Sequence, residues 1–207
     1  MNRLIYFSPV VIPIPRTDIY KRLGYRQGIT RVSSGRIKDT NRIIKEAAAL
    51  IKLKAMACIL TIRKVEPPRI YLSQSIAFNS RQVCDFLKGY SEVLFMGVTA
   101  GRKITQAIGK ELKNNRFNEA VIMDAVASEM VDSSLGWVMR QMAKKLKNEK
   151  KTLSDRRFSA GYADFTLDNQ RTIYRLLQLK RLGVSINKGF ILIPEKSVTA
   201  LSGIKVN

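Results

Sequence analysis

The sequence of 207 residues contains no histidine and only two cysteines, Cys58 and Cys84. Without histidine, the chain can form neither a Ser-His-Asp nor a Cys-His nucleophile relay, and it has no imidazole to act as an acid or base near neutral pH. Two thiolates are too few for a four-cysteine zinc or iron–sulfur site, and a disulfide scaffold is not expected at this length. Any chemistry must therefore use carboxylates, Lys, Arg, Tyr, Ser or a bound cofactor.

Acidic residues are also scarce, because 16 Asp and Glu stand against 37 Lys and Arg and leave a formal net charge of +21. The basic residues are spread along the chain, and their densest run lies within residues 140–151. A field of this sign favours partners of opposite charge, which are nucleic acid, an anionic membrane surface or an acidic protein. The alternative explanation of the charge is a solvated, lysine-rich surface that has no binding partner.

Long hydrophobic runs are absent, although 45% of the residues are hydrophobic. The longest apolar runs, such as residues 47–51 and 93–98, are far too short to span a bilayer. The apolar segment over residues 4–15 is interrupted by three prolines, which is not typical of a signal peptide. We therefore expect a cytoplasmic protein with no membrane partner, in which residues 1–207 form a single domain.

The hydrophobic periodicity changes along the chain and predicts a mixture of helices and strands. Helical spacing, with capping residues or glycines at several ends, predicts helices over residues 17–23, 39–51, 80–88, 104–113, 117–147 and 168–182. Runs of strand-forming residues predict strands over residues 55–64, 69–73, 93–98, 184–186 and 190–193. The segment from Gly97 to Gly101 has neither of the spacings of a nucleotide-binding loop, so we expect a tight turn there.

The predicted helix over residues 117–147 combines an apolar first half with three acids, Asp124, Glu129 and Asp132. Burial of an unpaired carboxylate is costly, so each acid needs a cation, a hydrogen-bond donor or a cleft. Helical spacing places Asp124, Ser128 and Asp132 in one row. This polar stripe forms either a salt-bridge network with the many basic residues or one wall of a binding cleft.

The segment after this helix, residues 156–165, mixes aromatic residues with glycine and has no helical period, so it predicts an ordered loop. Arg157 can hold a carboxylate through two parallel hydrogen bonds, and Gly161 lets a ligand approach the backbone closely. Tyr162 offers an aromatic face to a cation or a flat ring. Glu129 would complement a ligand ammonium or sulfonium if it faces the same cleft. A structural salt bridge of Arg157 with a packed Tyr162 is the alternative.

The pattern Arg157-x-x-x-Gly161-Tyr162, together with the residues around it, resembles the activation domain of cobalamin-dependent methionine synthase. The acidic helix precedes this loop, and the segment Ile193-Pro-Glu-Lys-Ser-Val198 follows it. Residues 20–25 and 97–101 also look like segments of free-standing members of that family. The resemblance covers most of the chain and implies an α+β fold, in which one C-shaped domain carries a twisted antiparallel sheet with flanking helices.

The resemblance also implies a ligand, S-adenosylmethionine, and a set of residues that hold it. By matching positions, Arg157 should bind the methionine carboxylate, the backbone at Ala160 and Gly161 should line the adenosyl group, and Tyr162 should pack beside the ligand. An acid in the middle of the long helix should face the positive end of the ligand. This acid is Glu129, although the shared Asp-Ala pair places the position at Ser128.

The function that follows from the resemblance is reactivation of a cobalamin-dependent methionine synthase by a separate subunit. S-adenosylmethionine would donate the methyl group for the reductive methylation of cob(II)alamin, which a partner subunit holds, and the chain would assist methyl transfer without acid or base chemistry of its own. An acidic electron donor, such as flavodoxin or ferredoxin, is the second expected partner.

Two alternatives remain, a basic nucleic-acid-binding protein and a docking scaffold that has lost its ligand. The sequence has no RNP-like aromatic strand, no KH loop and no zinc-finger spacing, which argues against nucleic acid as a partner.

Overall fold

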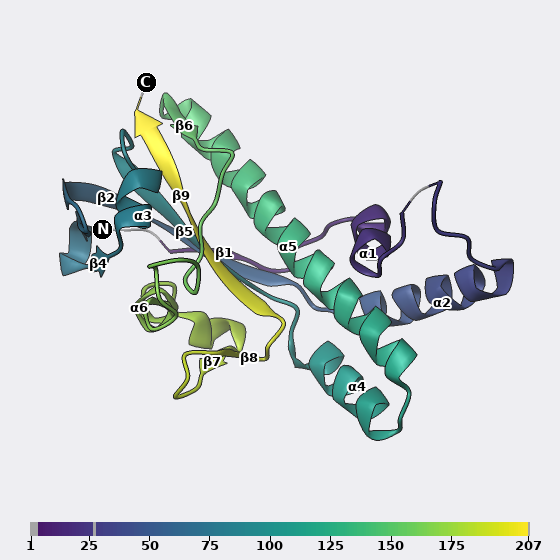
Figure 1. The fold of residues 1–207 in the computed structure, drawn as a ribbon. Coiled ribbons are helices and arrows are strands. Elements are labelled where there is room, and N and C mark those ends of the chain that lie inside the picture. The colour runs from purple at the N-terminus through teal and green to yellow at the C-terminus, as the bar shows by residue number, and fades with distance from the viewer. Residues whose placement is uncertain (1–3, 27, 207) are drawn as a thin grey trace.

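The computed structural model describes residues 4–26 and 28–206 and confirms an α+β fold (Figure 1). The helices are α1 (Arg16–Arg22), α2 (Ser34–Leu50), α3 (Arg81–Phe86), α4 (Arg102–Lys113), α5 (Phe117–Asn148) and α6 (Asn169–Leu176), with short 3-10 helices η1 (Ser73–Ser75) and η2 (Leu179–Leu182). The strands are β1 (Ile5–Phe7), β2 (Lys54–Glu66), β3 (Arg69–Leu72), β4 (Ala77–Asn79), β5 (Glu92–Thr99), β6 (Lys151–Leu153), β7 (Ser185–Ile186), β8 (Leu192–Ile193) and β9 (Ser197–Val206). Within the described residues, no helix is long and apolar enough to cross a membrane.

An antiparallel sheet with the strand order β4-β3-β2-β5-β9-β6 organises the chain. Strand β1 pairs with the first half of β2, and β3 pairs with the second half. Strand β9 pairs with β5 along almost its whole length, so that Val98 lies opposite Val198. The two strands β7 and β8 form a small separate sheet. The central strands β2, β5 and β9 are therefore distant in sequence and adjacent in space.

The central strands are buried on both faces, which explains why their sequences read as continuous apolar runs. In β5, Leu94 and Met96 contribute to the hydrophobic cluster under α5. Their neighbours Val93 and Phe95 contribute to a second cluster on the opposite face. The alternation follows from the two-residue period of a strand and separates the core into two layers.

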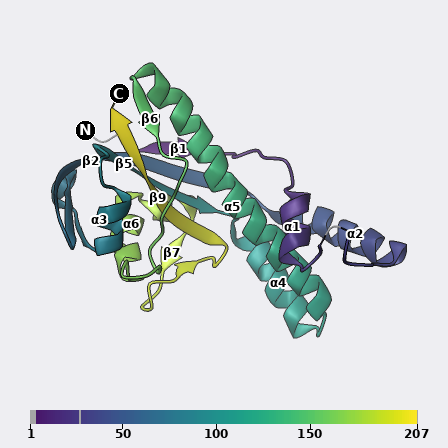
Figure 2. The same ribbon diagram turned by 45° about the horizontal axis from the view of Figure 1, so that its top comes forward.

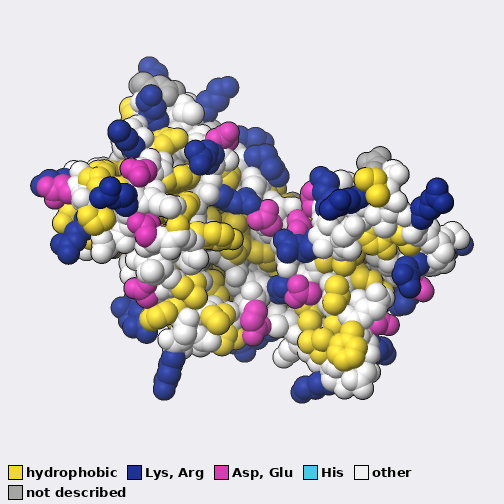
Figure 3. Space-filling view, in the orientation of Figure 1, with side chains coloured by type: hydrophobic (Ala, Val, Ile, Leu, Met, Phe, Trp, Pro, Cys, Tyr) yellow, Lys and Arg dark blue, Asp and Glu magenta, His cyan; other side chains and the backbone are white. Residues whose placement is uncertain are grey.

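Helix α5 crosses one face of the sheet diagonally, and its 32 residues span about 48 Å (Figures 1 and 2). Its first half extends beyond the sheet, where α1, α2 and α4 pack around it. This packing accounts for a helix that is apolar nearly all round at Ala125, Val126 and Ala127, which are all buried. The outline of the molecule narrows between these helices and the sheet (Figure 3).

The opposite face of the sheet is covered by α3, α6, η2 and the segment over residues 154–165. Phe165 is fully buried there, and its ring meets that of Phe78 edge-on at 5.3 Å. The ring of Phe158 lies 6.2 Å from Phe165. Aromatic pairs of this kind add about 0.5–1.5 kcal/mol each beyond the burial of their surface. The loop that carries the predicted binding motif is therefore a packed part of the core.

The sequence-based assignment of elements is confirmed for β2, β3, β5, α4 and α5, with bounds that differ by a few residues. The expected start of α2 at Asp39 is wrong, because the helix begins at Ser34 with the Ser33 side chain accepting a hydrogen bond from the Arg36 N–H. Asp168 precedes α6 as expected but forms no cap hydrogen bond, since its carboxylate accepts from the Thr166 hydroxyl instead. Strand β9 was not expected.

Candidate ligand-binding groove between α5 and β9

The loop over residues 154–165 is held against β9 by its backbone. The Phe158 and Leu201 backbones exchange two hydrogen bonds of 2.9 and 2.8 Å. The Ser202 hydroxyl donates to the Arg156 carbonyl oxygen at 2.9 Å. These bonds fix the start of the loop along one edge of β9 and set the position of Arg157, which lies between the two anchored residues.

The other end of the loop is fixed by Asp164 at the start of α3. The Asp164 carboxylate accepts hydrogen bonds from the Ser80 hydroxyl at 2.6 Å and from the Arg81 N–H at 2.7 Å. The Ser80 hydroxyl is the main cause that lowers the pKa of Asp164, and the backbone N–H groups of Arg81 and Gln82 add to it. Asp164 therefore ties the loop to a helix about eighty residues earlier in the chain.

Between these anchors the chain makes a tight turn at Gly161. Gly161 has a φ of +93°, a conformation that side chains rarely adopt. Its N–H donates to the Phe165 carbonyl oxygen at 2.7 Å, and the Phe165 N–H donates to the Tyr162 carbonyl oxygen at 3.0 Å. The turn leaves Tyr162 66% exposed, so its ring is available to a ligand.

Two adjoining cavities lie between α5 and β9, and together we call them the α5/β9 groove. The first has a volume of about 390 Å³, and the second has a volume of about 220 Å³. Both are lined by Asp132, Ser197 and Val198, so they lie side by side. The first is also lined by Leu135, Arg157, Phe158, Ser159, Ala160, Tyr162, Gln170 and Thr199. The second is also lined by Arg22, Ser128, Val131, Glu195 and Lys196.

Arg157, Ala160 and Tyr162, which the sequence singles out, thus line the same cavity, and Ser128 lines the adjoining one. Gly161 shapes the turn between Ala160 and Tyr162 and does not itself line either cavity in the described structure. The groove brings together residues from α5, the loop, α6 and β9. These segments are remote in sequence, so the motif alone could not define the site.

The polar stripe on α5 is both a salt-bridge network and a wall of the groove. The Lys196 ammonium contacts an Asp124 carboxylate oxygen at 2.6 Å and donates to the Ser128 hydroxyl at 2.9 Å. One turn further along, the Arg157 guanidinium contacts Asp132 Oδ1 at 2.5 Å. The two interpretations of this stripe therefore hold at the same time.

Glu129 lies apart from the groove lining. Its carboxylate contacts Arg22 Nε at 2.5 Å, and its side chain is only 13% exposed. Arg22 lines the second cavity, so Glu129 contacts a residue of the groove without lining the groove itself. Asp132 is the carboxylate that lines both cavities, and nothing in the sequence favours it over Glu129. The four-residue spacing from Ser128 to Asp132, which places both on one side of the helix, is the feature of the sequence that could have identified Asp132.

The groove offers binding groups and no activated nucleophile. Within the described residues both cysteines are free and buried, and burial raises the pKa of the Cys58 thiol to about 12. The Thr199 hydroxyl donates to Gln170 Oε1 at 2.6 Å. A ligand with both a carboxylate and a positive centre can use Arg157 and Asp132 together, because each of these side chains accommodates one of its charges.

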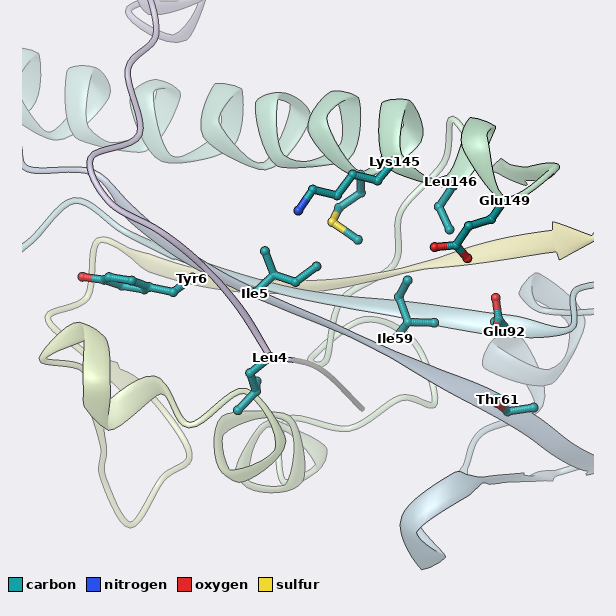
Figure 4. Close-up of a pocket in the computed structure, with 10 residues that line it drawn as sticks. Leu4, Ile5, Tyr6, Ile59, Thr61, Glu92, Lys145, Leu146 and Glu149 are labelled. Carbon is teal, nitrogen blue, oxygen red and sulfur yellow. The ribbon is translucent and has the colours of Figure 1, made fainter. Parts of the chain in front are cut away.

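A larger cavity of about 540 Å³ lies near the other end of α5 (Figure 4). Its lining is mixed, with apolar residues such as Ile5, Ile59 and Leu146 beside polar and charged ones. Two acids at its rim, Glu92 and Glu149, both pair with Lys151, at 2.9 and 3.0 Å. None of the site residues expected from the sequence lines this cavity.

The fold is similar to that of a solved domain. A crystal structure described as the MetH reactivation domain bound to AdoHcy superposes with a TM-score of 0.70, covering 97% of this chain and 78% of that one. The sequence identity is 10%, so the likeness establishes the fold and not the activity. No protein-family model and no curated protein sequence matches this chain.

Proposed function

We propose that the chain binds S-adenosylmethionine in the α5/β9 groove and serves as the reactivation subunit of a cobalamin-dependent methionine synthase. The observation that carries the proposal is the meeting of Arg157, Ala160 and Tyr162 with Asp132 and Ser128 in one groove. The fold likeness to a reactivation domain that binds AdoHcy supports it, since AdoHcy is S-adenosylmethionine without the transferable methyl group.

The residues of the groove fit the chemical groups of this ligand. The Arg157 guanidinium would bind the ligand carboxylate with two parallel hydrogen bonds, in place of its present bond to Asp132. Asp132 would then face the ammonium or sulfonium group, with the Ser128 hydroxyl one turn away. The backbone at Ala160 and Gly161 would line the adenosyl group, and the exposed Tyr162 ring would cover it.

The contribution of this chain to the reaction would be one of position. S-adenosylmethionine supplies a methyl group on a positively charged sulfur, and the groove would hold that group toward the cobalamin of a partner subunit. A fixed orientation raises the rate of such a transfer without any acid or base, which agrees with a chain that has no histidine. In this proposal residues 1–207 act as one cytoplasmic domain, and an acidic donor such as flavodoxin supplies the electron.

Calorimetric titration with S-adenosylmethionine tests the proposal. We expect saturable binding by the wild type, weakened about 10- to 100-fold in Arg157→Ala, because a hydrogen-bonded ionic contact contributes about 1.5–3 kcal/mol. Arg63→Ala is the matched control, since Arg63 is an exposed arginine on β2 outside the groove. Lack of saturable binding by the wild type, with and without a cobalamin-binding methionine synthase, would refute the proposal. Equal losses in the two variants would also refute it.

A further inference from the structure

A separate cavity of about 410 Å³ lies at the helical end of the molecule and is lined by residues before and within the first half of α2 and by the start of α5. We call it the α1/α2 cavity. It is lined by Leu23, Gly24, Tyr25, Thr30, Arg31, Val32, Ser33, Arg36, Thr40, Asn118, Val121 and Ile122. The cavity shares no lining residue with the α5/β9 groove.

The α1/α2 cavity has an uncompensated positive charge. Arg31 and Arg36 both line it, and no acidic residue is among its described lining residues. Neither guanidinium forms an ion pair or a hydrogen bond to another described side chain. By contrast, Arg42 on the same helix is paired with both Glu46 and Asp39. Two free guanidinium groups at one cavity favour an anion with several acceptor oxygens.

The start of helix α2 adds positive charge on the same side. Ser33 precedes the helix, Arg36 lies in its first turn, and both line the cavity. The Arg36 N–H already donates to the Ser33 hydroxyl, so this end contributes the partial positive charge that the first N–H groups of a 17-residue helix carry. Thr40, one turn further along, also lines the cavity, although only 4% of its surface is exposed. Its hydroxyl forms no hydrogen bond to any other described residue. This hydroxyl is not one of the fully buried unpaired groups among the described residues, so it is accessible from the cavity, and a ligand there could supply its hydrogen-bond partner.

Part of the wall is apolar and aromatic, beside the polar residues Thr30 and Asn118. Leu23, Tyr25 and Ile122 line the cavity, and Val121 beside them is 58% exposed, although it lies on a helix that is otherwise largely buried. An inorganic anion would leave this surface in contact with water. A phosphate attached to an organic ring would cover it and gain from the burial of apolar area.

We propose that the α1/α2 cavity binds a small organic phosphate, whose phosphate group contacts Arg31, Arg36 and the Thr40 hydroxyl while its organic part packs on Tyr25 and Val121. This site is independent of the proposed S-adenosylmethionine groove, so either can fail without the other.

Phenyl phosphate and inorganic phosphate are suitable probes, titrated into the full chain at constant ionic strength and followed by calorimetry. We expect phenyl phosphate to bind saturably and about 10-fold more tightly than inorganic phosphate, because only the former covers the apolar wall. Arg36→Ala should weaken phenyl phosphate binding at least 10-fold. Lys45→Ala is the matched control, because Lys45 is an exposed cation on the same helix outside the cavity. Its effect should stay below 2-fold.

Two substitutions at Thr40 separate a specific site from the general positive field. Thr40→Val keeps the shape and removes the hydroxyl, so we expect a loss of about 2- to 10-fold, while Thr40→Ser should retain binding. Thermal unfolding of both variants would confirm that they fold. Equal weakening by Arg36→Ala and Lys45→Ala would overturn the proposal, and so would unchanged binding in a folded Thr40→Val variant.

Discussion

At the scale of single residues, the groove is arranged around one exchangeable contact. Arg157 and Asp132 are 31% and 55% exposed, and ion pairs this accessible to water contribute little stability. A ligand carboxylate can therefore replace Asp132 at Arg157 at small cost, and the displaced acid is then free for a positive group. Arg157 and Asp132 thus define the charge pattern of a ligand for this groove, a carboxylate together with a positive group.

Asp164 is the residue whose loss should loosen the binding loop. Its folded-state pKa lies below the ordinary value, chiefly through the Ser80 hydroxyl, so its stabilising effect is present above about pH 4 and is lost as the pH falls through the lower folded-state pKa. We expect Asp164→Asn to unfold at lower urea concentration than the wild type at pH 7. The difference should disappear at a pH below the folded-state pKa, where the wild-type carboxyl is also neutral. A difference that persists there would show that Asp164 acts by other means.

The sequence predicted the loop residues of the groove better than the helix residue. Arg157 and Tyr162 lie within six positions of one another, so local spacing places them together. The choice among Ser128, Glu129 and Asp132 depends on which side of α5 faces β9, and this rotation is set by packing of the helix on the sheet. No property of the helix sequence alone contains that information.

At the scale of elements, β9 lines both cavities of the groove, yet the sequence pattern does not predict it as a strand. It lies between β5 and β6, and residues 199–204 are buried. Small and polar residues such as Ser202 and Gly203 occur where alternating apolar residues would identify a strand. Ser202 is needed as a hydrogen-bond donor to the loop, and Gly203 is needed to make room for a ring. Both requirements come from tertiary neighbours.

Gly203 gives a test of this explanation. A Cβ atom there would lie 2.5 Å from the Tyr90 ring, so Gly203→Ala should lower the free energy of unfolding by about 1–3 kcal/mol. Urea unfolding at pH 7 measures the change. Combining it with Tyr90→Ala should remove most of the additional loss. Gly109→Ala is the control, because Gly109 lies within α4 with open space around it, and alanine there should stabilise the helix by up to about 1 kcal/mol.

At the scale of the whole molecule, basic side chains greatly outnumber acidic ones, and several acids on α5 are paired with them, among them Asp124, Glu129 and Asp132. Figure 3 shows basic side chains spread over the view, with acidic and basic groups close together at the narrow middle. The last turns of α5 carry Lys144, Lys145 and Lys147 and end beside the large cavity of Figure 4. In the proposed function this surface would attract an acidic partner and increase the rate of association.

Charge reversal separates docking from ligand binding. In the variant Lys144→Glu with Lys145→Glu, binding of S-adenosylmethionine should change less than 2-fold, because both lysines lie outside the groove. The association rate with a cobalamin-binding methionine synthase should fall at least 10-fold at low salt. The fall should be smaller at 0.5 M salt, where the Debye length is only about 4 Å and charges farther apart are screened from one another. The docking scaffold alternative would instead be supported if reactivation were lost in this variant and kept in Arg157→Ala.

The pairing of β9 with β5 has a consequence for how the chain folds. Residues 98 and 198 lie opposite each other, so the chain must close a loop of about one hundred residues before β9 can form its side of the groove. Contacts between such remote segments form slowly, and the packing of α1 and α2 on α5 also joins segments more than sixty residues apart. The groove is therefore complete only after β9 has paired with β5, and ligand binding in the groove would report that this late step has taken place.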